Sequence, residues 1–212
     1  MEHDFVYADK EEVKEVRNIL LEIIHRVQNE LRECKDEITF QYQIVGSAKR
    51  NMITYDRKSN VGFDFDINLY VNDNGKFDNE PEALRRLLRL TFDRVSRYYG
   101  YHYCEDSTRV LTIKKISSYS SRILHSFDFC IISNQEPEYF VFFDKKENNY
   151  VWAKRKADLK EVQVKEKWLK KNGKWQEVRN HYLYLKDNNY NPNRKSISIY
   201  KETINNLYHT YH

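Results

Sequence analysis

Glycine and proline are scarce in this chain of 212 residues, which holds five Gly and three Pro. Such a composition excludes a collagen-like chain or a Gly/Pro-rich disordered chain and favours well-formed helices and strands. The three cysteines, Cys34, Cys104 and Cys130, lie far apart and form no Cys-x-x-Cys pair. An odd number without zinc-ligand spacing indicates reduced, partly buried cysteines of a cytoplasmic protein.

Long apolar runs are also missing. No stretch approaches 18 consecutive apolar residues, and acidic residues occupy the N-terminal region where a signal peptide would have its apolar core. We therefore expect a cytoplasmic protein with no membrane partner. The net charge is only +4, so a strongly basic face is not indicated and double-stranded DNA is not an expected partner.

What the chain does contain is typical of a folded enzyme-sized domain, with 40% hydrophobic and 32% charged residues. Its basic residues are unevenly distributed, because the segment 144–171 carries ten Lys/Arg against five Asp/Glu and includes two tryptophans. This segment either contacts nucleic acid or is a solvated face in which Lys and Glu pair along a helix.

Hydrophobic periodicity predicts a mixed α+β fold. Apolar residues at spacings of three and four predict helices, and alternation predicts strands. The expected helices are 8–36, 80–99, a stretch that begins at 159 and continues through 168 and past Gly173, 175–185 and a short last one after 193. The expected strands are 38–45, 62–71, 109–116, 123–132, 139–144 and 150–153. This order indicates a mixed β-sheet core over 1–157, with a long N-terminal helix, followed by a small C-terminal helical appendage over 158–212.

The strand 62–71 reads GFDFDINLYV. Because side chains alternate across a strand, Asp64 and Asp66 share one face while Phe63, Phe65 and Ile67 share the other. The two carboxylates then stand side by side, about 7 Å apart at Cα. They are either solvated acids of a charged strand or the ligands of a cation such as Mg²⁺.

A third acid lies in the apolar strand 123–132, where Asp128 is flanked by Phe127 and Phe129. A carboxylate in such a strand is costly unless it is paired, bound to a metal or open to a cleft. Three carboxylates on two strands suit a site for two divalent ions, and this favours the metal-ligand interpretation of Asp64 and Asp66.

The first predicted strand ends in Gly46-Ser47, followed by Lys49 and Arg50. Taken alone, this stretch is either a plain surface turn or a phosphate-binding turn, in which glycine lets the backbone approach an anion. The three carboxylates favour the second interpretation, with Gly46 and Ser47 holding the phosphates of a nucleoside triphosphate. Lys49 and Arg50 either neutralise those phosphates or are solvated.

The order Gly-Ser, then Asp-x-Asp on a strand, then a lone Asp on a later strand resembles the DNA polymerase beta-type nucleotidyltransferase superfamily. The helix that precedes Gly-Ser makes the chain more similar to the oligoadenylate synthase and bacterial cyclic-oligonucleotide synthase branch than to minimal antitoxin-type members. The resemblance covers 8 to about 153. The stretch 48–63 is longer than in many members, so a remodelled loop is expected there.

This resemblance implies that Asp64, Asp66 and Asp128 are the catalytic metal ligands for two Mg²⁺ ions, with Mn²⁺ as a possible substitute. It also implies that Gly46 and Ser47 bind the nucleotide and that Asp128 helps to deprotonate the acceptor hydroxyl. The expected reaction is transfer of a nucleoside monophosphate from an NTP, with ATP as the expected donor, and release of pyrophosphate. The acceptor is unspecified: a nucleotide, RNA, a protein or a small molecule.

The main alternative is a catalytically silent module of the same fold that binds RNA or a partner protein through 144–171.

Overall fold

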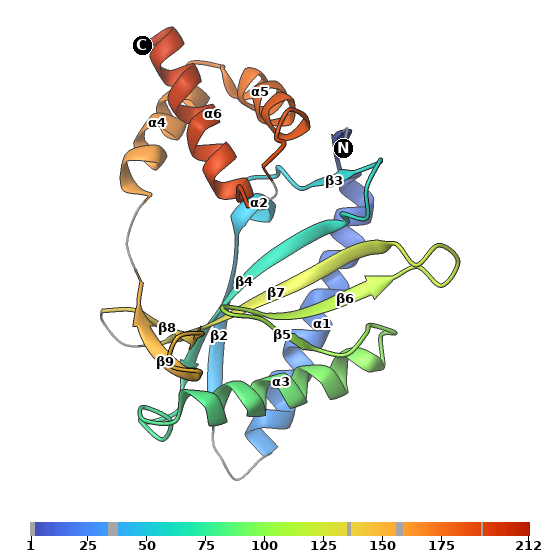
Figure 1. The fold of residues 1–212 in the computed structure, drawn as a ribbon, viewed down its shortest axis with the longest axis vertical. Helices are drawn as coiled ribbons and strands as arrows, with labels where there is room; N and C mark the ends of the chain where they lie inside the picture. The colour runs from blue at the N-terminus through green and yellow to red at the C-terminus, as the bar shows by residue number, and fades with distance from the viewer. Residues whose placement is uncertain (1–2, 34–37, 135–136, 156–158, 192) are drawn as a thin grey trace. The chain divides into compact units, whose positions relative to one another are not determined.

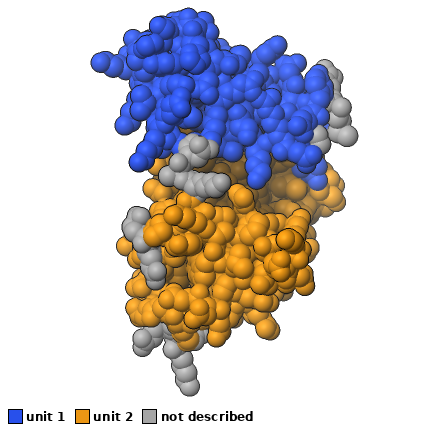
Figure 2. Space-filling view, turned by 60° about the vertical axis from the view of Figure 1, so that its left-hand side comes forward, with its two compact units in different colours: residues 1–7, 54–60, 156–212 blue, residues 8–53, 61–155 orange. Residues whose placement is uncertain are grey.

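The computed structural model describes residues 3–33, 38–134, 137–155, 159–191 and 193–212. It divides into two compact units (Figure 2): unit 1 contains 1–7, 54–60 and 156–212, and unit 2 contains 8–53 and 61–155. The predicted domain boundary at 157/158 lies outside the described residues. The C-terminal helices share unit 1 with 1–7 and 54–60, two segments that our sequence prediction places in the core.

Unit 2 contains a seven-stranded mixed sheet. Its strands are β2 (Thr39–Val45), β4 (Phe63–Asn72), β5 (Glu105–Asp106), β6 (Leu111–Ile116), β7 (Ile123–Ser133), β8 (Tyr139–Asp144) and β9 (Asn149–Lys154). The main order is β2-β4-β7-β6-β5, β8 pairs with the end of β7, and β9 pairs with β8. Within the described residues, β4 and β7 run parallel and the other pairs of this sheet are antiparallel. The predicted mixed sheet is confirmed.

Two helices cover one face of this sheet. The long helix α1 (Lys10–Glu33) buries the apolar stripe that its spacing predicts, and α3 (Pro81–Arg97) packs against α1, which it crosses in Figure 1. The Phe92 ring of α3 stacks on Phe129 of β7 with 4.1 Å between centroids. Aromatic packing of this kind and the buried aliphatic side chains of β4 form the core on this face. The opposite face carries the polar side chains of Asp64, Asp66 and Asn68 on β4 and of Ser126 and Asp128 on β7.

Unit 1 joins short elements that are distant in sequence. The strand β1 (Phe5–Tyr7) pairs with β3 (Thr54–Asp56) in an antiparallel two-stranded sheet. The helices α4 (Lys160–Lys171), α5 (Trp175–Asp187) and α6 (Ser196–Tyr211) follow. The prediction of a short last helix is wrong, because α6 has 16 residues. Its buried Ile199 and Ile204 give it an apolar face on which α4 and α5 pack. The stretch 48–63, where the sequence analysis expects a remodelled loop, contains the strand β3.

Candidate active site

The strand β4 has the two faces that its alternation predicts. Phe63, Phe65 and Ile67 are at most 2% exposed, whereas Asp64 and Asp66 are half-buried on the other face. The aromatic face supplies the driving force that fixes the register, since a slip of one residue would move every apolar side chain out of the core. Packing on one face of the sheet thereby places both carboxylates on the other.

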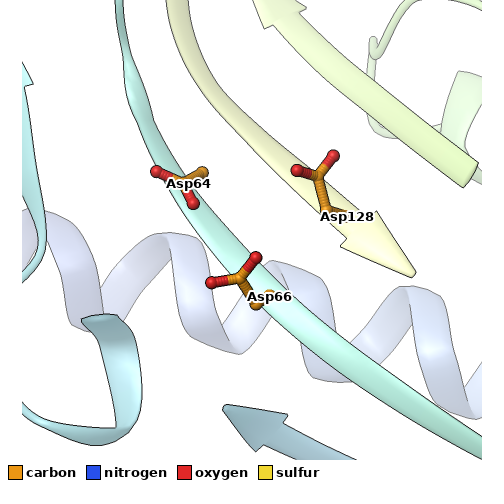
Figure 3. Close-up of side chains that lie close together, drawn as sticks. All are labelled: Asp64, Asp66 and Asp128. Carbon is orange, nitrogen blue, oxygen red and sulfur yellow. The ribbon is translucent and has the colours of Figure 1, made fainter. Parts of the chain in front are cut away.

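The pairing of β4 with β7 brings in the third carboxylate. In their parallel register, Asp66 lies opposite Asp128 and Asp64 lies opposite Ser126. Figure 3 shows Asp64 and Asp66 on β4 beside Asp128 on β7. Each of the three offers a carboxylate oxygen that lies within 4.8 Å of the others. We call Asp64, Asp66 and Asp128 the aspartate cluster; the structure brings together the three acids that the sequence singles out.

Proximity and burial make the charged form of this cluster costly. Burial, followed by the charges of Asp64 and Asp128, raises the pKa of Asp66 to about 7, although the Arg50 guanidinium acts in the opposite direction. Burial also raises the pKa of Asp128 to about 6, against a hydrogen bond from Thr112 that lowers it. Three carboxylates in this arrangement repel one another near neutral pH. A cation among them would remove that repulsion.

The donor set fits a hard divalent cation. Carboxylate oxygens are the ligands that Mg²⁺ and Mn²⁺ prefer in proteins, and a Mg²⁺ site needs only one or two of them when phosphate and water complete the shell. All three aspartates are half-buried rather than fully buried, so each remains partly accessible to solvent. The aspartate cluster is therefore compatible with a divalent metal site.

Gly46 lies against this cluster, where β2 passes directly into the short helix α2 (Gly46–Lys49). Its φ of +63° is left-handed, and a Cβ atom at this position would lie 1.8 Å from Asp66 Oδ2. A side chain at position 46 would therefore displace the Asp66 carboxylate. The sequence interpretation assigns the need for glycine to a phosphate; in the structure, the approach of Asp66 is already sufficient to require it.

Ser47, Lys49 and Arg50 of this turn differ in their exposure and in their relation to the aspartate cluster. The Ser47 carbonyl accepts hydrogen bonds from the backbone amides of Arg50 at 3.1 Å and Met52 at 2.9 Å, which fixes the chain after α2. Arg50 is half-buried, and its guanidinium is one of the charges that act on Asp66. Lys49 is exposed and is not one of those charges. The structure thus brings Gly46 and Arg50 to the aspartate cluster, but not Lys49.

The sequence analysis misses the residues on the other side of Asp128. Thr112 of β6 lies opposite Asp128, and its hydroxyl donates a hydrogen bond of 2.5 Å to Asp128 Oδ1. Beyond it, Lys114 forms an ion pair with Glu105 of β5 at 2.5 Å, and both charges act on Asp128. No sequence motif marks these residues, because only the register of β5, β6 and β7 places them beside the cluster.

The basic segment 144–171 does not form one surface element. Its first part belongs to β8 and β9 in unit 2, its second part to α4 in unit 1, and 156–158 lie outside the described residues. In α4, Lys165 and Lys170 pair with Glu161 and Glu166 one turn earlier. These i,i+4 pairs are typical of a solvated helix face.

Comparison with known proteins identifies the fold. No protein-family model matches the chain, and no curated protein does. Among solved structures, the chain is similar to the cyclic AMP-GMP synthase DncV of Vibrio cholerae, a prokaryotic cGAS homologue, with a TM-score of 0.62 and 12% identity over 93% of this chain and 67% of that one. The same synthase with nonhydrolyzable GTP gives a TM-score of 0.64 at 11% identity, covering 93% of this chain and 67% of that one.

A third structure, DncV with the linear intermediate 5′ pppA(3′,5′)pG, gives a TM-score of 0.57 at 10% identity, covering 84% of this chain and 60% of that one. The chain thus spans 60–67% of the length of these structures. This chain has the nucleotidyltransferase fold of these structures, which confirms the predicted fold class and, at the level of the fold, the predicted resemblance. Among the described residues, no helix is long and apolar enough to cross a membrane.

Proposed function

We propose that this protein is a metal-dependent nucleotidyltransferase that moves a nucleoside monophosphate from an NTP to a hydroxyl group and releases pyrophosphate. The observation that carries the proposal is the aspartate cluster, whose three carboxylates approach within 4.8 Å on the polar face of a nucleotidyltransferase-fold sheet. The complexes of DncV with nonhydrolyzable GTP and with pppA(3′,5′)pG support an NTP as the substrate class. We propose ATP as the donor.

Asp64, Asp66 and Asp128 would hold the divalent cations, which we propose to be two Mg²⁺ ions with Mn²⁺ as a substitute. When bound, the ions neutralise the charge that develops on the transferred phosphate and on the leaving group. Phosphoryl-type transfer needs little covalent chemistry from the protein, so the contribution of the chain is positioning and electrostatics.

Each residue near the cluster has a proposed task. Gly46 and Ser47 present the backbone that receives the triphosphate, and Arg50 adds a positive charge on that side of Asp66. Asp128, on the opposite side of Asp66, accepts the proton of the acceptor hydroxyl. The proposed task of Lys49, which is exposed, is to neutralise phosphate charge. Cys104, free and buried, is compatible with action in the cytoplasm.

The test is release of pyrophosphate from each of the four NTPs in the presence of Mg²⁺ or Mn²⁺. We expect ATP to give the largest signal and Asp64→Asn to remove it while the circular dichroism spectrum stays that of the wild type. RNA binding without pyrophosphate release from any NTP would overturn the proposal in favour of the silent binding module.

A further inference from the structure

The hydroxyl of Thr112 makes the closest polar contact to Asp128. Its Oγ1 atom donates to Asp128 Oδ1 at 2.5 Å, and Thr112 is only 9% exposed. A hydroxyl-to-carboxylate bond of this length is charge-assisted, the stronger class of hydrogen bond. The two residues lie directly opposite each other in the antiparallel pairing of β6 and β7, so the backbone ladder holds donor and acceptor in place.

Such a bond has a specific consequence beside two other carboxylates. Repulsion from Asp64 and Asp66 favours rotation of the Asp128 side chain away from the cluster. Thr112 opposes that rotation, because threonine is branched at Cβ and its χ1 angle is restricted within a strand. With Oδ1 held by the hydroxyl, the remaining acceptor positions of the Asp128 carboxylate stay directed at the cluster.

The neighbouring polar residues do not provide the same restraint. Lys114 carries a charge that acts on Asp128, but its ammonium group is paired with Glu105 at 2.5 Å. Both side chains of that pair are about one third exposed, and their influence on Asp128 is electrostatic rather than geometric. Of these described residues, Thr112 is thus the one that holds the Asp128 carboxylate by a direct hydrogen bond.

We propose that Thr112 is a positioning residue, which orients the Asp128 carboxylate so that the aspartate cluster binds a divalent cation and Asp128 can reach the acceptor hydroxyl. This inference rests on the proposed function. Hydrogen-bond partners of metal ligands typically change metal affinity or activity by about 10- to 100-fold when they are lost. A purely structural role for Thr112 would instead change folding stability and leave cation affinity unaltered.

The experiment measures the Kd of Mn²⁺ alone, by calorimetric titration, for the wild type, Thr112→Val and Thr112→Ser. Thr112→Val keeps the shape of the side chain and loses the hydroxyl. We expect its Kd for Mn²⁺ to rise about 10-fold. We also expect its kcat to fall by a larger factor than its KM for the NTP changes. Thr112→Ser keeps the donor and should stay within about threefold of the wild type. Thr112→Ala serves as a second hydroxyl-free variant if Thr112→Val does not fold.

Thr91→Val is the matched control. Thr91 is also buried in unit 2, at 2% exposure, and its hydroxyl donates to the Leu87 carbonyl within α3. The same chemical change there should leave Mn²⁺ affinity unchanged. If the wild type binds Mn²⁺ and the Kd of Thr112→Val lies within twofold of the wild-type Kd, the positioning role alone is overturned. Absence of Mn²⁺ binding to the wild type would overturn the metal site of the proposed function and this inference with it.

Discussion

Asp56 of β3 and the aspartate cluster on β4 and β7 are two solutions to placing carboxylates inside a protein. Asp56 is fully buried and accepts hydrogen bonds from the Asp4 and Lys58 amides and the Ser59 hydroxyl, with His3 Nδ1 at 2.7 Å. Burial by itself would raise its pKa, but these hydrogen bonds together lower the pKa well below its usual range.

The aspartate cluster shows the opposite balance. Asp66 and Asp128 have raised pKa values because burial and neighbouring carboxylates dominate over Arg50 and Thr112. A carboxylate that is surrounded by donors stabilises its own fold, whereas carboxylates that face one another hold unfavourable charge that a cation can relieve. Burial alone therefore does not distinguish a structural acid from a functional one; the groups that face the carboxylate do.

The largest effect is expected for the functional acids. Asp64→Asn should reduce nucleotidyl transfer about 1,000-fold or more, since the ion that it helps to hold is worth several kcal/mol in the transition state. The stability of the apo protein should stay within about 1 kcal/mol of the wild type, because the residue is not part of the core. Pyrophosphate release and thermal unfolding measure the two quantities. Activity within a few fold of the wild type would remove Asp64 from the site.

Asp56→Asn should have the reverse profile. We expect a loss of about 2 to 4 kcal/mol in the free energy of unfolding near pH 7, because buried donors lose a charged acceptor. Since the folded-state pKa of Asp56 is lowered, its contribution is present above about pH 4 and is lost as the pH falls through that lowered value. Chemical denaturation at several pH values measures this. Equal stability of variant and wild type near pH 7 would refute the structural assignment.

Gly46→Ala tests how tightly the cluster is packed. The added Cβ would meet Asp66 Oδ2 at 1.8 Å, and the left-handed φ would cost about 1 kcal/mol for a non-glycine residue. We expect the Asp66 carboxylate to move aside and Mn²⁺ affinity to fall about 10-fold or more, as it does on loss of a supporting contact. Gly173→Ala is the matched control, because Gly173 also has a left-handed φ but open space around its missing Cβ. Equal Mn²⁺ affinity of Gly46→Ala and wild type would contradict the packing argument.

Asp128→Asn should change the stability of the apo protein only slightly, and in the direction of higher stability. Because the folded-state pKa of Asp128 is raised to about 6, ionisation at higher pH destabilises the folded state, and stability is regained as the pH falls toward 4. The variant should therefore be about 1 kcal/mol more stable than the wild type near pH 8, with the difference vanishing below about pH 4. Chemical denaturation across this range is the measurement. A variant less stable than the wild type at pH 8 would mean that Asp128 is a structural acid like Asp56.

Sequence reasoning captures the regions in which a regular pattern coincides with packing. The strands β4 and β7 and the helices α1 and α3 follow from apolar periodicity, and the three aspartates stand out because acids are unfavourable in such strands. The approach of Asp66 to Gly46 and the bond from Thr112 to Asp128 depend on which residues of neighbouring strands meet. Alternation within one strand assigns each residue to a face of the sheet but does not name its partner on the next strand.

The two-stranded sheet of unit 1 is the least predictable part of the described structure. The strands β1 and β3 have three residues each and lie about fifty positions apart, so neither shows a period and their pairing is purely tertiary. The sequence therefore does not predict a buried acid at Asp56, because a Thr-Tyr-Asp stretch before polar residues is typical of a turn. Asp64 and Asp66 are conspicuous because they interrupt a strong apolar pattern, and Asp56 is inconspicuous because it interrupts none.

The most direct test of the central claim is a crystal structure of the protein soaked with a nonhydrolyzable ATP analogue and Mg²⁺. We predict a cation bound by carboxylate oxygens of Asp64, Asp66 and Asp128, and a triphosphate that contacts the backbone of Gly46 and Ser47. An analogue bound elsewhere, with the aspartate cluster unchanged and without a cation, would contradict the account.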